Sequence, residues 1–172
     1  VDKIIQYHAV QRPDSAALLQ DGVELGFGDV EQRVLQIANG LCALGLGKGD
    51  RLVLVGENSI DQVLLILAAA RMGAVSVTLN YRLAPPEMAY IIDDACARLV
   101  AVLDPQFNTV VAQAVAGQER HYFGLGESLP DGWQDWQAWW PQQPAKPLEP
   151  VTDVDDPFLQ LYTSGTTGRP KG

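Results

Sequence analysis

The chain has 172 residues, of which 47% are hydrophobic and 19% are charged, a composition typical of one globular domain rather than a disordered chain. Its net charge of −9, without any cluster of basic residues, argues against a nucleic-acid-binding surface. The longest uninterrupted apolar stretch, residues 63–70, is too short to cross a membrane.

Apolar periodicity and turn residues predict helices and strands that alternate along the chain. The pair Asp21-Gly22 between two short apolar runs predicts a β-hairpin near the N-terminus. Apolar residues at steps of three and four over 29–44 predict a helix with one buried face, and Asn58 or Ser59 can cap the next helix. The expected helices are 2–11, 29–44, 58 or 59 to 72, 85–94 and 105–116, and the expected strands are 16–20, 23–27, 51–55, 74–79, 98–103, 121–123 and 158–162.

This alternation predicts an α/β fold in which a parallel-rich sheet has helices on both faces. The early hairpin is expected to add an antiparallel edge to that sheet. No internal repeat interrupts the pattern, so we expect residues 1–172 to form a single unit. The sequence does not predict an oligomeric state.

The segment 124–150 differs from the rest because it holds all four tryptophans and several prolines. Steps of three place Trp133, Trp136 and Trp139 along one side of a short helix. We expect these rings to pack against the edge of the sheet or against a neighbouring part of a larger protein. An aromatic face for a partner or an acyl chain is the alternative. The proline-rich stretch 141–150 is expected to be an extended connector.

The two cysteines, Cys42 and Cys96, lie in apolar helical contexts and lack the spacing of a paired site. We expect them to be buried, reduced thiols, which favours a cytoplasmic protein. His8 and His121 also lack metal-ligand spacing.

Two pairs of adjacent acids are further candidates for a metal site, Asp93-Asp94 and Asp155-Asp156. Adjacent carboxylates are usually solvated charges at turns or helix ends, so we assign them no metal role.

The most informative stretch follows the last predicted strand and ends the chain. Glycines there let backbone N–H groups converge on an anion, and Ser164, Thr166 and Thr167 add hydroxyl donors. Lys171 adds a positive charge suited to phosphate oxygens. Pro170 stands where a Walker A loop would need glycine, so this is a different kind of phosphate loop. A flexible polar linker is the alternative.

Residues 163–172, Thr-Ser-Gly-Thr-Thr-Gly-Arg-Pro-Lys-Gly, resemble the phosphate-loop signature of the adenylate-forming superfamily. This superfamily includes acyl-CoA synthetases, luciferases and the adenylation domains of peptide synthetases. Gln160 is a mild departure, because the family more often has an apolar residue there. Three upstream segments also resemble the family: 45–53, 57–59 and 73–83. The sequence of the last segment is commoner in acyl-CoA synthetases than in peptide synthetase domains. The resemblance covers nearly the whole chain except about 105–150.

The resemblance implies the N-terminal α/β subdomain of an AMP-binding domain, ending in the phosphate-binding loop 163–172. The parent enzyme would be an acyl-CoA synthetase, an acid–thiol ligase of fatty acid metabolism. It would use ATP and Mg²⁺ to convert a carboxylic acid into an acyl-adenylate and pyrophosphate, and then transfer the acyl group to CoA. The matching positions imply a phosphate cradle with Lys171 as its cation and Thr167 as a weaker Mg²⁺ candidate; its other members are Thr163, Ser164, Gly165, Thr166 and Gly168.

The family's adenine and ribose pockets, its metal-binding glutamate and its catalytic lysine are expected beyond residue 172. We therefore expect no catalytic residue in this chain, and no adenylation or thioester formation by the chain alone. The acyl substrate is not predicted, because its pocket is expected mostly in the missing sequence. Two alternatives stay open: an amino-acid adenylation domain of a peptide synthetase, and a non-catalytic binding or scaffold module that retains half of the fold.

Overall fold

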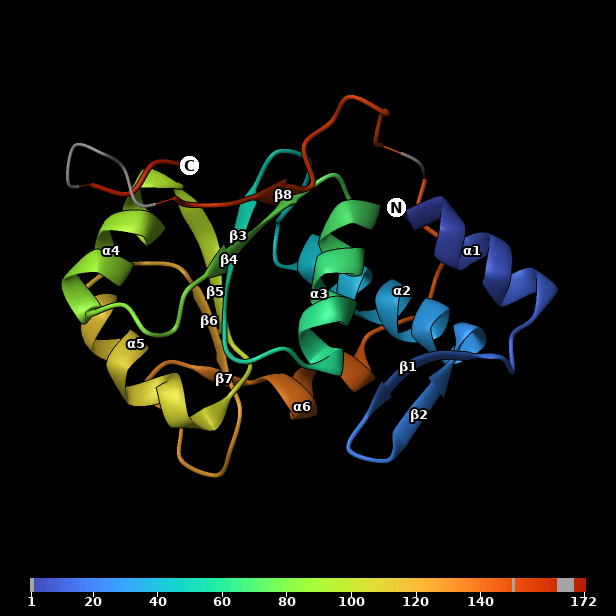
Figure 1. Ribbon diagram of the computed structural model, residues 1–172, viewed down its shortest axis with the longest axis horizontal. Helices are drawn as coiled ribbons and strands as arrows, with labels where there is room; N and C mark the ends of the chain where they lie inside the picture. The colour runs from blue at the N-terminus through green and yellow to red at the C-terminus, as the bar shows by residue number, and fades with distance from the viewer. Residues whose placement is uncertain (1, 150, 164–168) are drawn as a thin grey trace.

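The computed structural model describes residues 2–149, 151–163 and 169–172 and shows an α/β fold built on one parallel sheet (Figure 1). In these residues the sheet has six strands in the order β7-β6-β5-β3-β4-β8, and every neighbouring pair is parallel. The strands are β3 (Arg51–Val55), β4 (Val75–Leu79), β5 (Ala97–Val102), β6 (His121–Gly124), β7 (Gln134–Asp135) and β8 (Leu159–Gln160). The predicted fold class is confirmed.

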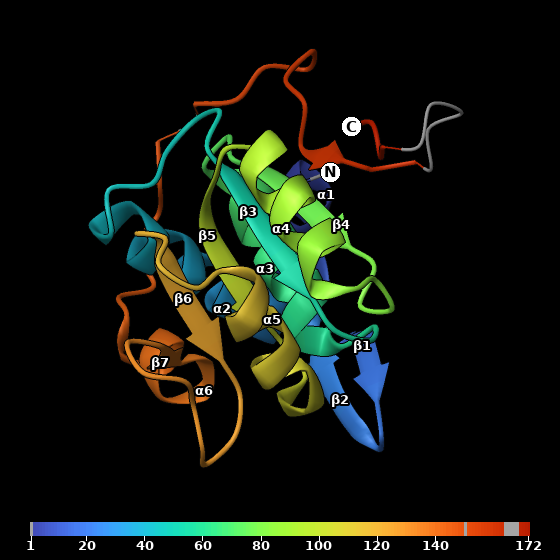
Figure 2. The ribbon, with the colours of Figure 1, turned by 90° about the vertical axis from the view of Figure 1, so that its left-hand side faces the viewer.

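Helices cover both faces of this sheet, with α4 and α5 on one face and α2 and α3 on the other (Figure 2). The position of the central strand β3 explains its apolar sequence. Leu52 and Leu54 belong to one core cluster, whereas Val53 and Val55 belong to the other. A strand that is buried on both faces needs consecutive apolar residues. The helices are α1 (Asp2–Gln11), α2 (Phe27–Ala43), α3 (Ile60–Arg71), α4 (Pro85–Asp94), α5 (Asn108–Ala114) and α6 (Trp136–Trp139).

Side chains at the helix starts fix where the helices begin. Ser59 caps α3, because its hydroxyl accepts a hydrogen bond from the backbone N–H of Gln62 at 3.2 Å. At α4 the carboxylate of Glu87 accepts from the backbone N–H of Ala84 at 2.9 Å, and Pro85 occupies the first turn, where its missing N–H does no harm. These local signals explain why both predicted helices are correct to within a residue or two.

The predicted hairpin forms, but its predicted place is wrong. Strands β1 (Ala16–Gln20) and β2 (Val23–Gly26) pair with each other in a separate two-stranded sheet instead of extending the main sheet. Asp21 and Gly22 make the turn with φ of 50° and 80°. Leu18 and Leu25 pack against the core on the side of α2 and α3, so the hairpin covers that helical layer.

Two other predicted elements are shorter than expected. The helix expected over 105–116 is a 3₁₀ turn, η1 (Pro105–Phe107), followed by α5, and the strand expected over 158–162 is only β8.

The tryptophan segment is only partly as predicted. Trp136 and Trp139 pack around Phe123 in the core cluster on the side of α2 and α3. Trp133 does not share their face: it stacks on Tyr122, at 5.5 Å between ring centroids, and packs on the opposite core cluster. The reason is that Asp135 caps the helix, so that α6 begins only at Trp136 and helical spacing does not apply to Trp133, two residues before the cap.

The stretch after α6 begins with a 3₁₀ turn, η2 (Trp140–Gln142), and continues as an extended connector along α2. The side-chain amide of Gln36 donates hydrogen bonds to the carbonyls of Pro141 and Gln143, and that of Asn39 donates to the carbonyl of Lys146. The connector is therefore fastened to the helix as it returns toward β8 at the opposite edge of the sheet.

The cysteine prediction is half correct. Cys42 and Cys96 are free thiols, but both side chains are exposed rather than buried. Cys42 lies on the outer side of the last turn of α2, and Cys96 lies in a turn with φ of 50°. Within the described residues, no helix is long and apolar enough to cross a membrane.

Candidate functional site

The candidate site begins where the chain leaves β8, the strand that pairs with β4 at one edge of the sheet. Ser76 and Val77 of β4 pair with Leu159 and Gln160, and the backbone N–H of Ser76 donates to the carbonyl of Phe158 at 3.0 Å. From β8 the chain runs toward α4 (Figure 1). The strand that precedes the glycine-rich loop is thus part of the rigid sheet.

The base of the loop is closed by backbone pairing. Thr163 and Lys171 form an isolated antiparallel bridge, in which each backbone N–H donates to the other's carbonyl at 3.0 Å. The structure therefore brings together the two described members of the predicted cradle, Thr163 and Lys171. The other predicted members, among them the Mg²⁺ candidate Thr167, lie outside the described residues; they are Ser164, Gly165, Thr166, Thr167 and Gly168.

The residue before the bridge is held by helix α4. The hydroxyl of Tyr162 donates a hydrogen bond to Oδ2 of Asp94 at 2.6 Å, and the side-chain amide of Gln160 donates to the Tyr162 oxygen at 3.2 Å. Burial and the hydrogen bond to Asp94 raise the pKa of Tyr162. Tyr162 consequently keeps its proton at neutral pH and stays a donor.

The far side of the loop also contacts α4. The guanidinium of Arg169 lies over the ring of Tyr90, 5.5 Å from its centroid, which is within the range of a cation–π interaction. After the bridge, Gly172 passes against Tyr162: a Cβ added at Gly172 would lie 2.6 Å from Cζ of Tyr162. Only glycine allows this approach without moving the ring.

Sequence reasoning missed the role of Asp94. The pair Asp93-Asp94 was expected to be solvated charge at a helix end, and both side chains are indeed exposed. Each nevertheless has a specific partner: Asp94 accepts from Tyr162, and Asp93 forms an ion pair with Arg120 at 2.6 Å. No local pattern could have found the first contact, because it joins residues that lie far apart in the sequence.

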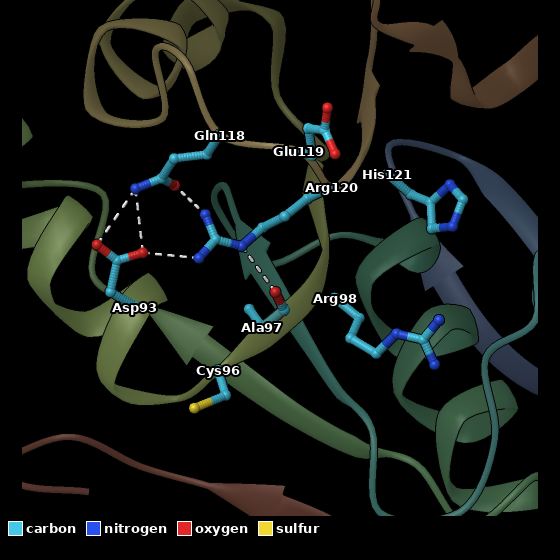
Figure 3. Close-up of a pocket in the computed structure, with 8 residues that line it drawn as sticks. All are labelled: Asp93, Cys96, Ala97, Arg98, Gln118, Glu119, Arg120 and His121. Carbon is cyan, nitrogen blue, oxygen red and sulfur yellow. Dashed lines mark hydrogen bonds and ion pairs between the residues drawn. The ribbon is translucent and has the colours of Figure 1, made fainter.

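A separate hollow of about 780 Å³ lies at the amino ends of β5 and β6 (Figure 3). Its charged groups are largely engaged with one another: Arg120 hydrogen-bonds Asp93, Gln118 and the carbonyl of Ala97. Arg98 at its border pairs with Asp50 at 2.9 Å. Because its arginines already have carboxylate partners, the hollow is a poorer candidate for an anion site than the loop. Its lining residues are Asp93, Cys96, Ala97, Arg98, Gln118, Glu119, Arg120 and His121.

Within the described residues, no three His, Cys, Asp or Glu side chains gather closely enough to hold a metal ion. His121 lines the hollow described above, whereas His8 packs against Phe27 and hydrogen-bonds Arg12.

Comparisons with known proteins agree with the loop motif. The sequence matches the model of the family described as AMP-binding enzyme over residues 5–172. A fatty acid–[acyl-carrier-protein] ligase, ScoC, from Streptomyces coeruleorubidus is 35% identical over 168 residues, which cover 96% of this chain and 31% of that protein. A feruloyl-CoA synthase from an Amycolatopsis species is 34% identical over 93% of this chain and 30% of its own length.

Solved structures give the same picture. The crystal structure of the anthranilate CoA ligase AuaEII in complex with anthranoyl-AMP superposes with a TM-score of 0.89 and 27% identity. The match covers 98% of this chain and 33% of that one. This chain therefore spans about a third of the length of the proteins that it resembles.

Proposed function

Because the chain belongs to the AMP-binding enzyme family, we propose that it is the N-terminal part of an ATP-dependent acid–thiol ligase. The reaction has two steps. A carboxylate attacks the α-phosphate of ATP to give an acyl-adenylate and pyrophosphate, and the thiol of CoA then displaces AMP to give a thioester. Residues 1–172 supply the phosphate-binding part of this enzyme.

One observation supports this proposal above the others: the glycine- and hydroxyl-rich stretch is closed at its base by the pairing of Thr163 with Lys171. Glycines and hydroxyl side chains between two paired residues are a composition suited to binding an anion through backbone N–H and hydroxyl donors. The chemical difficulty of the first step is the repulsion between an anionic carboxylate and a polyanionic nucleotide. Donors and a lysine at the β- and γ-phosphates reduce that repulsion and orient the leaving pyrophosphate.

In this proposal the cradle comprises Thr163, residues 164–168 and Lys171. Mg²⁺ enters with ATP as its counter-ion, and Thr167 is the residue of this chain proposed to contact it. Asp93-Asp94 have no part in holding the metal, since Asp94 accepts a hydrogen bond from Tyr162 and Asp93 pairs with Arg120.

The thiol acceptor is proposed to be CoA. The names of two similar proteins point to different acceptors. Feruloyl-CoA synthase names a CoA thioester, and fatty acid–[acyl-carrier-protein] ligase names an acyl-carrier protein. The segment 73–83 favours CoA, because its sequence resembles that of acyl-CoA synthetases. The exposed free thiols Cys42 and Cys96 support a reducing compartment, which we propose to be the cytoplasm.

The test uses the full-length protein that contains this chain. Acid-dependent exchange of labelled pyrophosphate into ATP is measured with a panel of fatty, aromatic and amino acids, and thioester formation is measured separately with CoA and with a carrier protein. We expect exchange with a fatty or aromatic acid, and thioester with CoA. Exchange with amino acids only would indicate a peptide-synthetase type of domain. No exchange with any acid would favour a non-catalytic module.

A second assay addresses the chain by itself. We propose that residues 1–172 bind phosphate weakly and do not catalyse either step, because the groups that contact adenine and ribose are expected elsewhere. Pyrophosphate release from ATP is measured for the isolated chain and for the full-length protein with the same acid. Turnover by the isolated chain would contradict the proposal that residues 1–172 alone are inactive.

A further inference from the structure

We propose that helix α4 positions the phosphate loop, with Asp94 and Tyr90 as positioning residues for ATP. This inference rests on the phosphate-binding function proposed above and adds a second element to it. Both residues lie in the last two turns of α4, and each contacts one of the two segments that flank the loop.

Asp94 contacts the segment that enters the loop. Its carboxylate accepts the hydroxyl of Tyr162 at 2.6 Å, directly before Thr163 and the bridge. A hydrogen bond to a charged acceptor is stronger than one between neutral groups. The Tyr162 ring also packs on the core cluster that contains α4, so polar and apolar contacts fix the same side chain.

Tyr90 contacts the segment that leaves the loop. Arg169 lies over the Tyr90 ring, one turn before Asp94 on the same helix, and the Tyr90 hydroxyl lies 3.5 Å from Oδ1 of Asp94. Since Lys171 is bridged to Thr163, both flanks of the loop are attached to each other and to α4.

Helix α4 is a firm support. Met88, Ile91 and Ile92 are buried between it and the sheet, with at most 2% of their surface exposed. A loop whose ends are fixed to a packed element loses less conformational freedom when it binds a ligand, which improves affinity without any new contact to that ligand.

The direction in which a change of Asp94 shifts ATP affinity distinguishes a positioning role from a simple charge effect. A carboxylate near a polyanion binding site repels the polyanion, so simple removal of its charge would favour ATP. Removal of a positioning contact would disfavour it. Asp94→Ala therefore shifts ATP affinity in opposite directions under the two accounts. Asp94→Asn separates them further, because the amide oxygen can still accept the Tyr162 hydroxyl without the charge.

The experiment measures KM for ATP, KM for the acid, kcat and equilibrium binding of MgATP in the full-length protein. We expect Asp94→Ala and Tyr162→Phe each to raise KM and Kd for ATP by about three- to tenfold, with KM for the acid changed less than about twofold. The double variant should be little worse than either single variant, because both changes remove the same contact. Tyr90→Ala should weaken ATP binding. Asp94→Asn should recover part of the affinity that Asp94→Ala loses, and Tyr90→Phe part of the affinity that Tyr90→Ala loses, because each conservative variant keeps the contacting group.

The matched control is Asp93→Ala, which removes the same charge from the same helix end but contacts Arg120 rather than the loop. It should leave KM for ATP unchanged, and thermal unfolding of each variant checks that the fold is intact. Normal or tighter ATP binding by Asp94→Ala, or an equal loss in Asp93→Ala, would overturn the positioning role and leave the proposed function standing. A wild-type protein that neither binds nor turns over MgATP would overturn both.

Discussion

The indole ring of Trp139 lies directly against Gly40 in the last turn of α2. A Cβ added at Gly40 would lie 2.8 Å from the ring atoms Cη2 and Cζ2 of Trp139 and 2.7 Å from Cγ of Gln143. Glycine inside a helix costs about 1 kcal/mol relative to alanine. Here it allows the tryptophan segment to pack on the helix, and this packing places the connector that leads back to β8.

We predict that Gly40→Ala destabilises the protein by about 1–3 kcal/mol despite the better helix propensity of alanine, because the new methyl group overpacks the Trp139 contact. The measurement is the free energy of unfolding in urea. Gly47→Ala is a suitable control, because a Cβ there meets nothing within 4 Å. In a Trp139→Leu background the penalty should shrink; a stabilised Gly40→Ala protein would show that the ring moves away easily.

Arg71 and Glu31 provide a second prediction. They join α3 to α2 through two hydrogen bonds of 3.0 and 2.8 Å, and only 5% of the Arg71 side chain is exposed. Glu31→Ala removes both of these hydrogen bonds from a buried guanidinium, so we predict a loss of about 2 kcal/mol in the free energy of unfolding.

The double replacement Glu31→Leu/Arg71→Met distinguishes charge burial from packing. Removing both charges together should be less harmful than Glu31→Ala alone, because an apolar side chain then replaces the buried guanidinium that Glu31→Ala leaves in place. If the double variant is at least as unstable as the single one, the apolar stem of Arg71 matters more than its charge.

The fold was largely predictable because its signals are local. The strand over 51–55 is apolar at every position after Arg51, and the cap at Ser59 is visible in the sequence. The position of the hairpin was not predictable. Asp21-Gly22 determines that two strands turn back on each other, but not which other surface they cover.

For the candidate site, the sequence predicts the composition of the loop but not the contacts that support it. The order of residues from Thr163 to Lys171 indicates phosphate chemistry, and their pairing agrees with a loop. The support from Asp94 depends on a contact between α4 and Tyr162, which follows β8, and these two segments are brought together only by the order of strands in the sheet. A helix-end carboxylate looks the same in sequence whether it faces water or a tyrosine.

Lys171 is the described residue of the cradle whose charge can be tested most directly. We predict that Lys171→Met raises KM for ATP in the full-length protein by about tenfold, because a charge-assisted contact to phosphate is lost. Lys171→Arg should retain part of the affinity. The exposed Lys146 serves as a control, because Lys146→Met removes the same charge at a position outside the loop. It should leave KM for ATP unchanged. Equal effects of the two methionine variants would point to net charge rather than to the loop.

Asp61 gives a prediction about pH. Its carboxylate accepts the indole N–H of the fully buried Trp136 at 3.0 Å and the amide of Gln137 at 2.7 Å. Burial raises the pKa of Asp61, while these two hydrogen bonds and the charge of Arg33 oppose the rise. The folded protein therefore holds this proton more tightly than the unfolded chain. The contribution of Asp61 to stability should therefore fall as pH rises from the ordinary aspartate pKa of about 3.9 through the higher folded value.

Asp61→Asn removes that titration but keeps an oxygen for the Trp136 N–H, and Gln137 can turn its amide to pair with the new NH₂ group. We predict that Asp61→Asn gains stability relative to wild type as pH is raised from 4 to 7. Asp61→Ala should lose about 1–2 kcal/mol at pH 7, because the buried indole N–H of Trp136 loses its acceptor. Urea unfolding of the three proteins across this pH range measures both effects. A constant difference between Asp61→Asn and wild type at every pH would show that Asp61 titrates alike in the folded and unfolded chains.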